Sequence, residues 1–361
     1  MIILLLLPLF RMPAFAETVE SELAGRTGVY SMERELSDEA KQISGELVTD
    51  GSYDTRGAMQ RLAERILERW RAELRGSLGI VSSLLALSVL STVADSLCKS
   101  TELRKYAELA CCAAAAFLLT DGVGSMIEAT VAALNELSDF SQTALPTLYT
   151  AAAAAGMLSS SAAKYAAVSL SLNVMMRVAN SVIIPLLYAY LALSLTDSLF
   201  VNSVSAAAAR LIKWLCGTVM TAMTILFGAY VGMTDIVSSG VDAAAVKTAK
   251  TVISTALPVV GGIVSDASAA VVSAAGVIRS SAGVFGLIAV CAICAGPFAA
   301  LSVRFLLLKS AAAVTEGMPN ARLSALLNDI GSAMAMLLGL LGSCGIMLFI
   351  SFTAAIKAVR L

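Results

Sequence analysis

Residues 280–303 read SSAGVFGLIAVCAICAGPFAALSV, a run of 24 residues without a charged side chain. Residues 330–356 read IGSAMAMLLGLLGSCGIMLFISFTAAI and give 27 more uncharged residues. A helix needs about 20 mainly apolar residues to cross the roughly 30 Å hydrocarbon core of a bilayer. Each run is therefore long enough to cross a membrane as one helix.

Shorter runs of the same kind recur upstream. They cover residues 77–94, 109–127, 140–163, 178–196 and 214–234. Only 14% of the 361 residues are charged, against about 25% in soluble domains. The sequence thus predicts an all-α fold, a polytopic helical membrane protein with about seven transmembrane helices. Residues 165–176 and 251–278 are also apolar, but the first stretch is short and Asp266 interrupts the second. For each of these two stretches, the sequence is consistent with a re-entrant helix, an interfacial helix or a broken helix.

Charged residues are concentrated near the N-terminus. Residues 1–16, MIILLLLPLFRMPAFA, end in Ala14-Phe15-Ala16, the small-residue pattern of a signal-peptide cleavage site. An uncleaved, shallow anchor is the alternative. Residues 17–75 then carry 13 acidic and 9 basic side chains. We expect a signal peptide over 1–16, an extracytoplasmic polar segment over 17–76 and a transmembrane domain over 77–361.

The second half of the polar segment has helical periodicity. Its apolar residues recur at steps of three and four and are Met59, Leu62, Ala63, Ile66, Leu67, Trp70 and Leu74. This spacing predicts an amphipathic helix over residues 57–75. Two roles fit it equally: a solvated helix leading into the first span, or an interfacial or partner-binding helix with Trp70 at the head-group level.

Lysine and arginine placement predicts the orientation of the first spans, because cytoplasmic loops are enriched in these residues. With the polar segment outside, the first loop, which contains Arg104 and Lys105, lies inside. Counting seven spans, however, puts Arg210 and Lys213 outside. It does the same for Arg304, Lys309 and Arg322 if the C-terminus is inside. The first half of the topology is therefore better determined than the second.

Several classes of chemistry are disfavoured by composition. The chain contains no histidine, which removes histidine-based zinc sites and Ser-His-Asp triads. No basic patch suggests nucleic-acid binding, and no pair of carboxylates or glycine-rich phosphate loop suggests catalysis. Cys291 and Cys294 have the CxxC spacing, but no second pair accompanies them, and helix packing is the favoured interpretation. We therefore expect no enzyme activity, no cofactor and no metal. We expect the protein to contact the lipid bilayer and not to bind nucleic acid.

Small residues recur every fourth position in the last span, at Gly331, Ala335, Gly339 and Ser343. Such faces let helix backbones approach closely in lipid. Packing within the monomer is the first interpretation. Self-assembly into a homo-oligomer, or contact with another membrane protein, is the alternative.

Ionisable residues and prolines within apolar stretches give the remaining candidates. Arg177 lies inside the membrane if residues 165–196 form one helix, but the favoured interpretation starts the helix near Val178 and makes Arg177 a cytoplasmic flank. Asp266 follows Pro258-Val-Val-Gly261-Gly262, a sequence that would loosen a helix at membrane depth as in transporters. A kink that serves only the packing of a structural helix would give the same pattern of proline and glycine.

This region also carries a family resemblance. The matching pieces are Lys247-Thr-Ala-Lys250, Leu257-Pro-Val-Val-Gly261, Ser265-Asp-Ala267 and Gly283-Val-Phe-Gly286, together with the Pro185 helix that ends near Ser194-Leu-Thr-Asp197. With its signal-like start and multiple spans, the chain resembles stage III sporulation protein AE over most of its length.

The resemblance implies a role in endospore formation. Members of this family are multi-pass proteins of the mother-cell membrane that surrounds the forespore. They belong to a channel or secretion-like complex with a secretion-type ATPase, ring-forming proteins of the intermembrane space and a forespore partner. The family has no established catalytic residues, so none is transferred to this chain. A different class of function, an autonomous small-solute transporter with a broken-helix midplane site near Pro258, Gly261, Asp266 and Arg177, is the alternative.

Overall fold

The computed structural model describes residues 55–97, 100–154, 158–200, 203–256, 261–318 and 320–357. The predicted signal peptide and most of the polar segment lie outside the described residues. Pro258 does as well.

Long helices make up the fold. They are α5 (Thr55–Leu97), α6 (Thr101–Ala154), α7 (Leu158–Val178), the π-helical turn η3 (Ala179–Ile183), α8 (Ile184–Leu199), α9 (Ser203–Ala256), α10 (Gly261–Glu316) and α11 (Ala321–Lys357). Six stretches of these helices are long and apolar enough to cross a membrane. The prediction of an all-α, polytopic membrane fold is confirmed, and the predicted amphipathic helix over 57–75 lies within α5.

The predicted spans over 109–127 and 140–163 are not separate helices. Both lie largely on α6, which continues unbroken for 54 residues and contains Pro146. At 1.5 Å per residue this helix is about 80 Å long, far more than a bilayer core requires. Asp121, Glu128 and Asp139 lie in and between the two stretches and resemble a polar loop between two spans. Acidic side chains raise the cost of membrane burial without ending a helix, so the backbone continues through them.

The expectation of a helix start near Val178 is also wrong. α7, η3 and α8 form one helical rod in which η3 is flanked on both sides by helical backbone. Pro185 follows this turn. Proline has no N–H and its ring crowds the carbonyl four residues earlier, and a π-helical turn accommodates such a defect without breaking the helix. Residues 165–176 are therefore the first part of this rod, and Arg177 lies within it.

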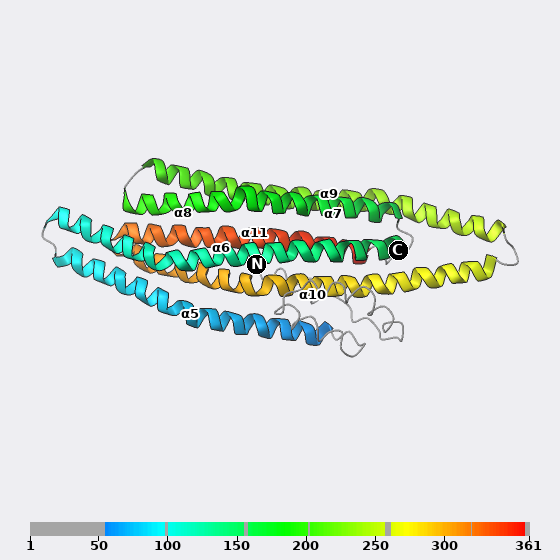
Figure 1. The fold of residues 1–361 in the computed structure, drawn as a ribbon, viewed down its shortest axis with the longest axis horizontal. Coiled ribbons are helices and arrows are strands. Elements are labelled where there is room, and N and C mark those ends of the chain that lie inside the picture. The colour runs from blue at the N-terminus through cyan, green and yellow to red at the C-terminus, as the bar shows by residue number, and fades with distance from the viewer. Residues whose placement is uncertain are drawn as a thin grey trace.

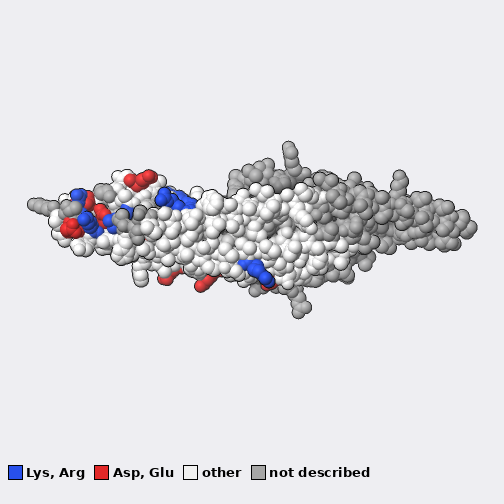
Figure 2. All heavy atoms as spheres, turned by 90° about the horizontal axis from the view of Figure 1, so that it is seen from above, with Lys and Arg blue, Asp and Glu red and all other residues white. Residues whose placement is uncertain are grey.

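The helices run antiparallel along one long axis (Figure 1). The connections α5–α6, α8–α9 and α10–α11 lie at one end, on the left in Figure 1. We call it the basic end, because it gathers basic residues from three helix pairs: Arg104, Lys105, Arg210, Lys213, Lys309 and Arg322. Charged side chains are visibly concentrated there in Figure 2. The sequence expectation that put Arg210 and Lys213 on the side opposite Arg104 fails, because α6 crosses once where two spans were counted.

The core lies between α10, α11 and α6. In the most apolar 18-residue stretch of α10, 72% of residues are buried, whereas in the corresponding stretch of α9 only 17% are buried. Phe352 of α11 is fully buried and stacks on Phe140 of α6, with ring centroids 6.0 Å apart. Its ring fills the space beside Gly286 of α10. These three residues mark one height along the bundle.

Candidate functional site

Polar and charged side chains occur at several places along these apolar helices. One group lies on the outer face of α6. Asp121, Glu128, Asn135 and Asp139 are all exposed. Their steps of seven, seven and four residues put them in a single stripe along the helix. We call it the acidic face of α6. The opposite side of the helix carries the buried core residues Met126, Leu134 and Leu137.

The height of this face along the bundle follows from two contacts. At one end, Nη1 of Arg304 donates to the carbonyl oxygen of Gly122 at 2.7 Å. At the other, Phe140 stacks on Phe352, whose ring lies against Gly286. Residues 122–140 of α6 thus lie alongside residues 286–304 of α10, which include most of the uncharged run 280–303.

Carboxylates at this height are costly toward lipid. An acidic residue at the centre of a transmembrane helix costs about 2.5 to 3.5 kcal/mol on insertion scales. Three of them exposed on one stripe are difficult to reconcile with a face covered by acyl chains. The acidic face of α6 therefore suits water or a protein partner better than lipid.

Arg177 lies at a similar height on the neighbouring rod. Tyr165 of α7 packs against Tyr149 of α6, with ring centroids 6.1 Å apart. From that contact, Arg177 is twelve residues along α7 and Asp139 ten residues back along α6, about 18 and 15 Å toward the basic end. Arg177 is exposed. Helix α7 thus adds a cation near the depth at which α6 exposes carboxylates.

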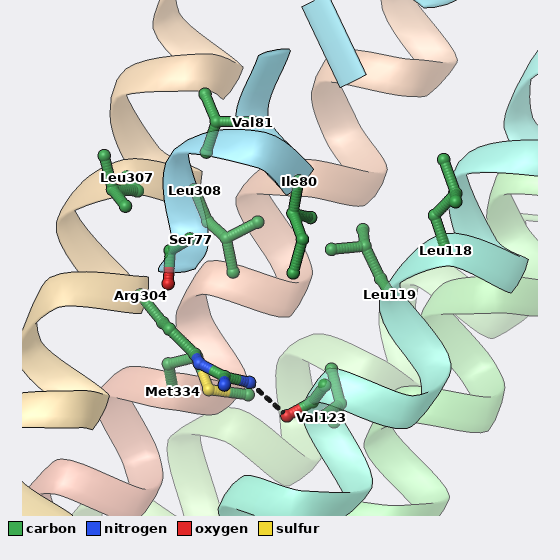
Figure 3. Close-up of a pocket in the computed structure, with 11 residues that line it drawn as sticks. Ser77, Ile80, Val81, Leu118, Leu119, Val123, Arg304, Leu307, Leu308 and Met334 are labelled. Atoms are coloured by element: carbon green, nitrogen blue, oxygen red, sulfur yellow. Dashed lines mark hydrogen bonds between the residues drawn. The ribbon is translucent and has the colours of Figure 1, made fainter. Parts of the chain in front are cut away.

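Arg304 ties three helices together on the inner side. Its Nε donates to Oε1 of Glu73 on α5 at 3.0 Å, in addition to the bond to Gly122 of α6. Figure 3 shows the guanidinium reaching from α10 toward α6, beside a cavity of about 40 Å³. The walls are mainly apolar, among them Ile80, Leu119 and Met334. That volume has room for a water molecule or two and for nothing larger.

A second polar group, which we call the lysine cluster, lies nearer the basic end. Nζ of Lys213 on α9 and Nζ of Lys309 on α10 each donate to Oγ of Ser332 on α11, both at 3.0 Å. Lys309 also donates to the carbonyl and the side-chain oxygen of Asn328, at 3.0 and 2.6 Å. The hydroxyl of Tyr190 on α8 donates to Oδ1 of neighbouring Asp329 at 3.3 Å. Four helices therefore meet through side chains at this point.

The predicted small-residue face of α11 divides between two neighbours. A Cβ on Gly331 would lie 3.5 Å from Cβ of Leu308 on α10, whereas one on Gly339 would lie 3.5 Å from Cε of Met220 on α9. Ala335 is exposed, and the hydroxyl of Ser343 donates to the carbonyl of Gly339 within the helix. The structure uses two of these four positions for close approach, each to a different helix.

The other candidates are not brought together. Gly261 is the first residue of α10, at the end opposite the basic end (Figure 1). Asp266 follows in the second turn of α10, 20 residues or about 30 Å before Gly286. Arg177 is on a different rod, near the height of Gly286. The described residues thus separate Arg177 from the Gly261–Asp266 region along the bundle axis.

Cys291 and Cys294 are free thiols in α10. The sulfur of Cys294 lies 3.3 Å from where a Cβ on Gly345 of α11 would stand. Cys294 thus lies in the seam between α10 and α11, the two most buried helices. Within the described residues, no group of cysteine and carboxylate side chains has an arrangement that could hold a metal ion.

Sequence reasoning missed both the acidic face as a stripe and the lysine cluster. The stripe was detectable, because a helix continued through residues 121–139 would have put its acidic residues in register. The cluster was not, because it joins residues 119 positions apart in sequence.

Comparison with known proteins identifies a family. The family model described as stage III sporulation protein AE matches residues 41–359, most of the chain. Neither the curated proteins nor the solved structures contain a match.

Proposed function

The chain belongs to the stage III sporulation protein AE family, and from this premise we propose that it is a membrane subunit of the channel or secretion-like complex between mother cell and forespore. The family assigns the protein to stage III of sporulation, and the six apolar helices are those of a multi-pass membrane protein. In this proposal the chain is a platform or conduit and not an enzyme. Its partners are a secretion-type ATPase, ring-forming proteins of the intermembrane space and a forespore protein.

The acidic face of α6 carries the proposal. Asp121, Glu128 and Asp139 are exposed at the height of the most apolar part of α10. A protein that acted alone in lipid would leave these carboxylates against acyl chains, at a cost of several kcal/mol in total. Assembly with other subunits, or a shared water-filled passage, removes that cost. This favours a subunit of a complex over an autonomous transporter.

The basic end indicates how the protein is oriented in the membrane. Arg104, Lys105, Arg210 and Lys213 all gather at this end, and basic residues are typical of the cytoplasmic side. We therefore orient the basic end toward the mother-cell cytoplasm. The N-terminal polar segment then lies in the intermembrane space, where ring-forming proteins would meet it. Epitope tags inserted at residues 156 and 201 should be accessible from opposite sides; access from the same side would contradict six antiparallel crossings.

Neutralising the acidic face tests membership of the complex. The triple variant Asp121→Asn, Glu128→Gln, Asp139→Asn keeps the size of each side chain and removes three charges. We expect the purified variant to melt within a few degrees of wild type, but to lose sporulation and co-purification with its partners from sporulating cells. The matched control is Glu102→Gln with Glu316→Gln, two exposed carboxylates outside the stripe. Normal sporulation and unchanged partners in the triple variant would refute the role of this face.

A further inference from the structure

The lysine cluster contains two ammonium groups that converge from different helices. Lys213 and Lys309 both donate to Oγ of Ser332 at 3.0 Å, so their Nζ atoms are at most 6.0 Å apart. Neither lysine forms an ion pair with a carboxylate of the described residues, whereas Lys105 is paired with Glu102 at 3.1 Å. The carboxylate of Asp329 interacts electrostatically with both lysines without forming an ion pair, so two positive charges are held close together beside a single negative one.

Hydrogen-bond counting shows which of these groups has donors to spare. Ser332 accepts from both lysines and donates to the carbonyl of Asn328 at 2.9 Å, so its hydroxyl is saturated. Lys309 uses its three N–H groups on Asn328, which accepts twice, and on Ser332. Lys213 donates only to Ser332 among the described residues. An ammonium carries three donors, which leaves Lys213 two for an external acceptor.

The surroundings of Lys213 indicate the kind of acceptor. Trp214, the next residue of α9, is 64% exposed, and Leu211 is 62% exposed. On α10, Leu306 and Val314 are exposed on either side of Lys309. Tryptophan beside exposed aliphatic side chains is typical of a helix surface at the membrane–water interface. The ammonium groups therefore lie where apolar surface meets the basic end of the bundle.

We propose that Lys213 and Lys309 bind the phosphate of an anionic phospholipid head group at the basic end of the bundle. Lys213 supplies the free N–H donors, Lys309 adds the second positive charge, and Ser332 holds the two ammonium groups together. Basic pockets between transmembrane helices on the cytoplasmic side bind such head groups. The exposed apolar residues of α9 and α10 provide surface for the acyl chains.

Trp214 is a built-in reporter for this site. The full chain with Trp70→Phe leaves Trp214 as its only tryptophan. In detergent, phosphatidylglycerol with brominated acyl chains should quench Trp214 fluorescence in a saturable way. Unlabelled phosphatidylglycerol should compete, and phosphatidylcholine should not. Equal quenching by the two brominated lipids would overturn the proposal. Displacement by inorganic phosphate at the same concentration would overturn the assignment to a lipid, because it would show a site for free phosphate.

Substitutions locate the binding to the two lysines. Lys213→Gln should weaken phosphatidylglycerol binding roughly fivefold, the contribution of one basic residue near a charged membrane surface. Lys213→Arg should restore most of the affinity. The control Lys105→Gln removes a paired lysine from the same end and should leave binding unchanged. Lys309 also cross-links α10 to α11, so Lys309→Gln changes stability as well as charge. Its affinity for phosphatidylglycerol is therefore compared with that of the wild type at temperatures where the two melting curves give the same folded fraction. Wild-type affinity in Lys213→Gln would refute the site.

Discussion

The α10–α11 pair and the outer helices α5 and α9 are all apolar, yet they are packed in opposite ways. Glycines of the inner pair are in close contact with side chains across the seam. A Cβ on Gly286 would lie 2.0 Å from Cε1 of Phe352, and one on Gly345 would lie 3.3 Å from the sulfur of Cys294. Three glycines of the outer helices, Gly79 of α5 and Gly217 and Gly228 of α9, have no atom of a neighbouring helix within 4 Å of the same position.

The difference shows what decides burial in this protein. Lipid is as apolar as a leucine side chain, so hydrophobicity alone does not drive one helix against another in a bilayer. Close approach at small residues does, because it maximises van der Waals contact. A glycine therefore indicates close helix packing only where it faces a large side chain of the neighbouring helix. Where no side chain faces it, a glycine does not contribute to helix association.

The largest expected effect is at Gly286. Gly286→Val would drive a branched side chain into the ring of Phe352, which is fully buried and stacked on Phe140. The ring has no free volume to enter, so we expect destabilisation at or above the upper end of the ~1–3 kcal/mol typical of overpacking. Thermal melting of the purified protein in detergent measures it.

A compensating substitution separates overpacking from loss of the glycine itself. Phe352→Ala alone should destabilise the fold by roughly 3–5 kcal/mol through its cavity. Combined with Gly286→Val, it should cost clearly less than the sum of the two single changes. Additive effects would mean that Gly286→Val does not act through the ring of Phe352.

The next effect concerns how an outer helix is attached. α5 is joined to the core by the Glu73–Arg304 ion pair, and Arg304 also donates to Gly122. Both charged side chains are nearly four-fifths shielded. Arg304→Leu would leave Glu73 without its partner, and we expect a loss of about 1–3 kcal/mol together with faster proteolysis within α5.

The variant Arg304→Lys separates the effect of the charge from the effect of the guanidinium geometry. Lysine keeps the charge but cannot point one N–H at Glu73 and another at Gly122 in the fixed geometry of a guanidinium. It should recover part of the stability of Arg304→Leu and not all of it. Wild-type stability of Arg304→Leu would show that α5 is held by apolar packing, like the inner pair.

Much of the architecture was predictable from residue patterns alone. Long uncharged runs such as 280–303 and 330–356 predict membrane helices, because crossing a bilayer requires apolar length. The number of crossings was not predictable in the same way. Asp121, Glu128 and Asp139 in α6 and Arg177 in α7 resemble boundaries, but a charged side chain only raises the cost of transfer into the membrane, and the helix continues through each of them.

The polar sites were less accessible to sequence reasoning. Lys213 and Arg304 were recognised only as topology signals, because their partners Ser332 and Glu73 are 119 and 231 positions away in sequence. Nothing local distinguishes a lysine that flanks a span from one that bridges two helices. The family resemblance was confirmed by the match over residues 41–359.

A smaller effect is expected where the inner pair turns. Asn320 precedes α11, and its Oδ1 accepts from the backbone N–H of Leu323 at 3.2 Å while its Nδ2 donates to Ser91 of α5 at 2.9 Å. Asn320→Ala removes an N-cap worth about 1 kcal/mol. Ser91→Ala keeps the cap and removes only the acceptor of the bond from Nδ2, so we expect it to cost less than Asn320→Ala. If Ser91→Ala is as damaging as Asn320→Ala, the contact with α5 matters more than the cap, as measured by melting in detergent.

The smallest effect is expected at the outer glycines, and it completes the comparison. Gly217→Ala and Gly228→Ala add a methyl group where no atom lies within 4 Å. Alanine is the better helix former by up to about 1 kcal/mol, so both variants should melt at or slightly above the wild-type temperature. Destabilisation similar to Gly286→Val would mean that α9 is packed as closely as the seam. Unchanged melting with lost sporulation would instead show that this open face of α9 meets another subunit, because a methyl group that the isolated chain tolerates would then block an approach made only in the complex.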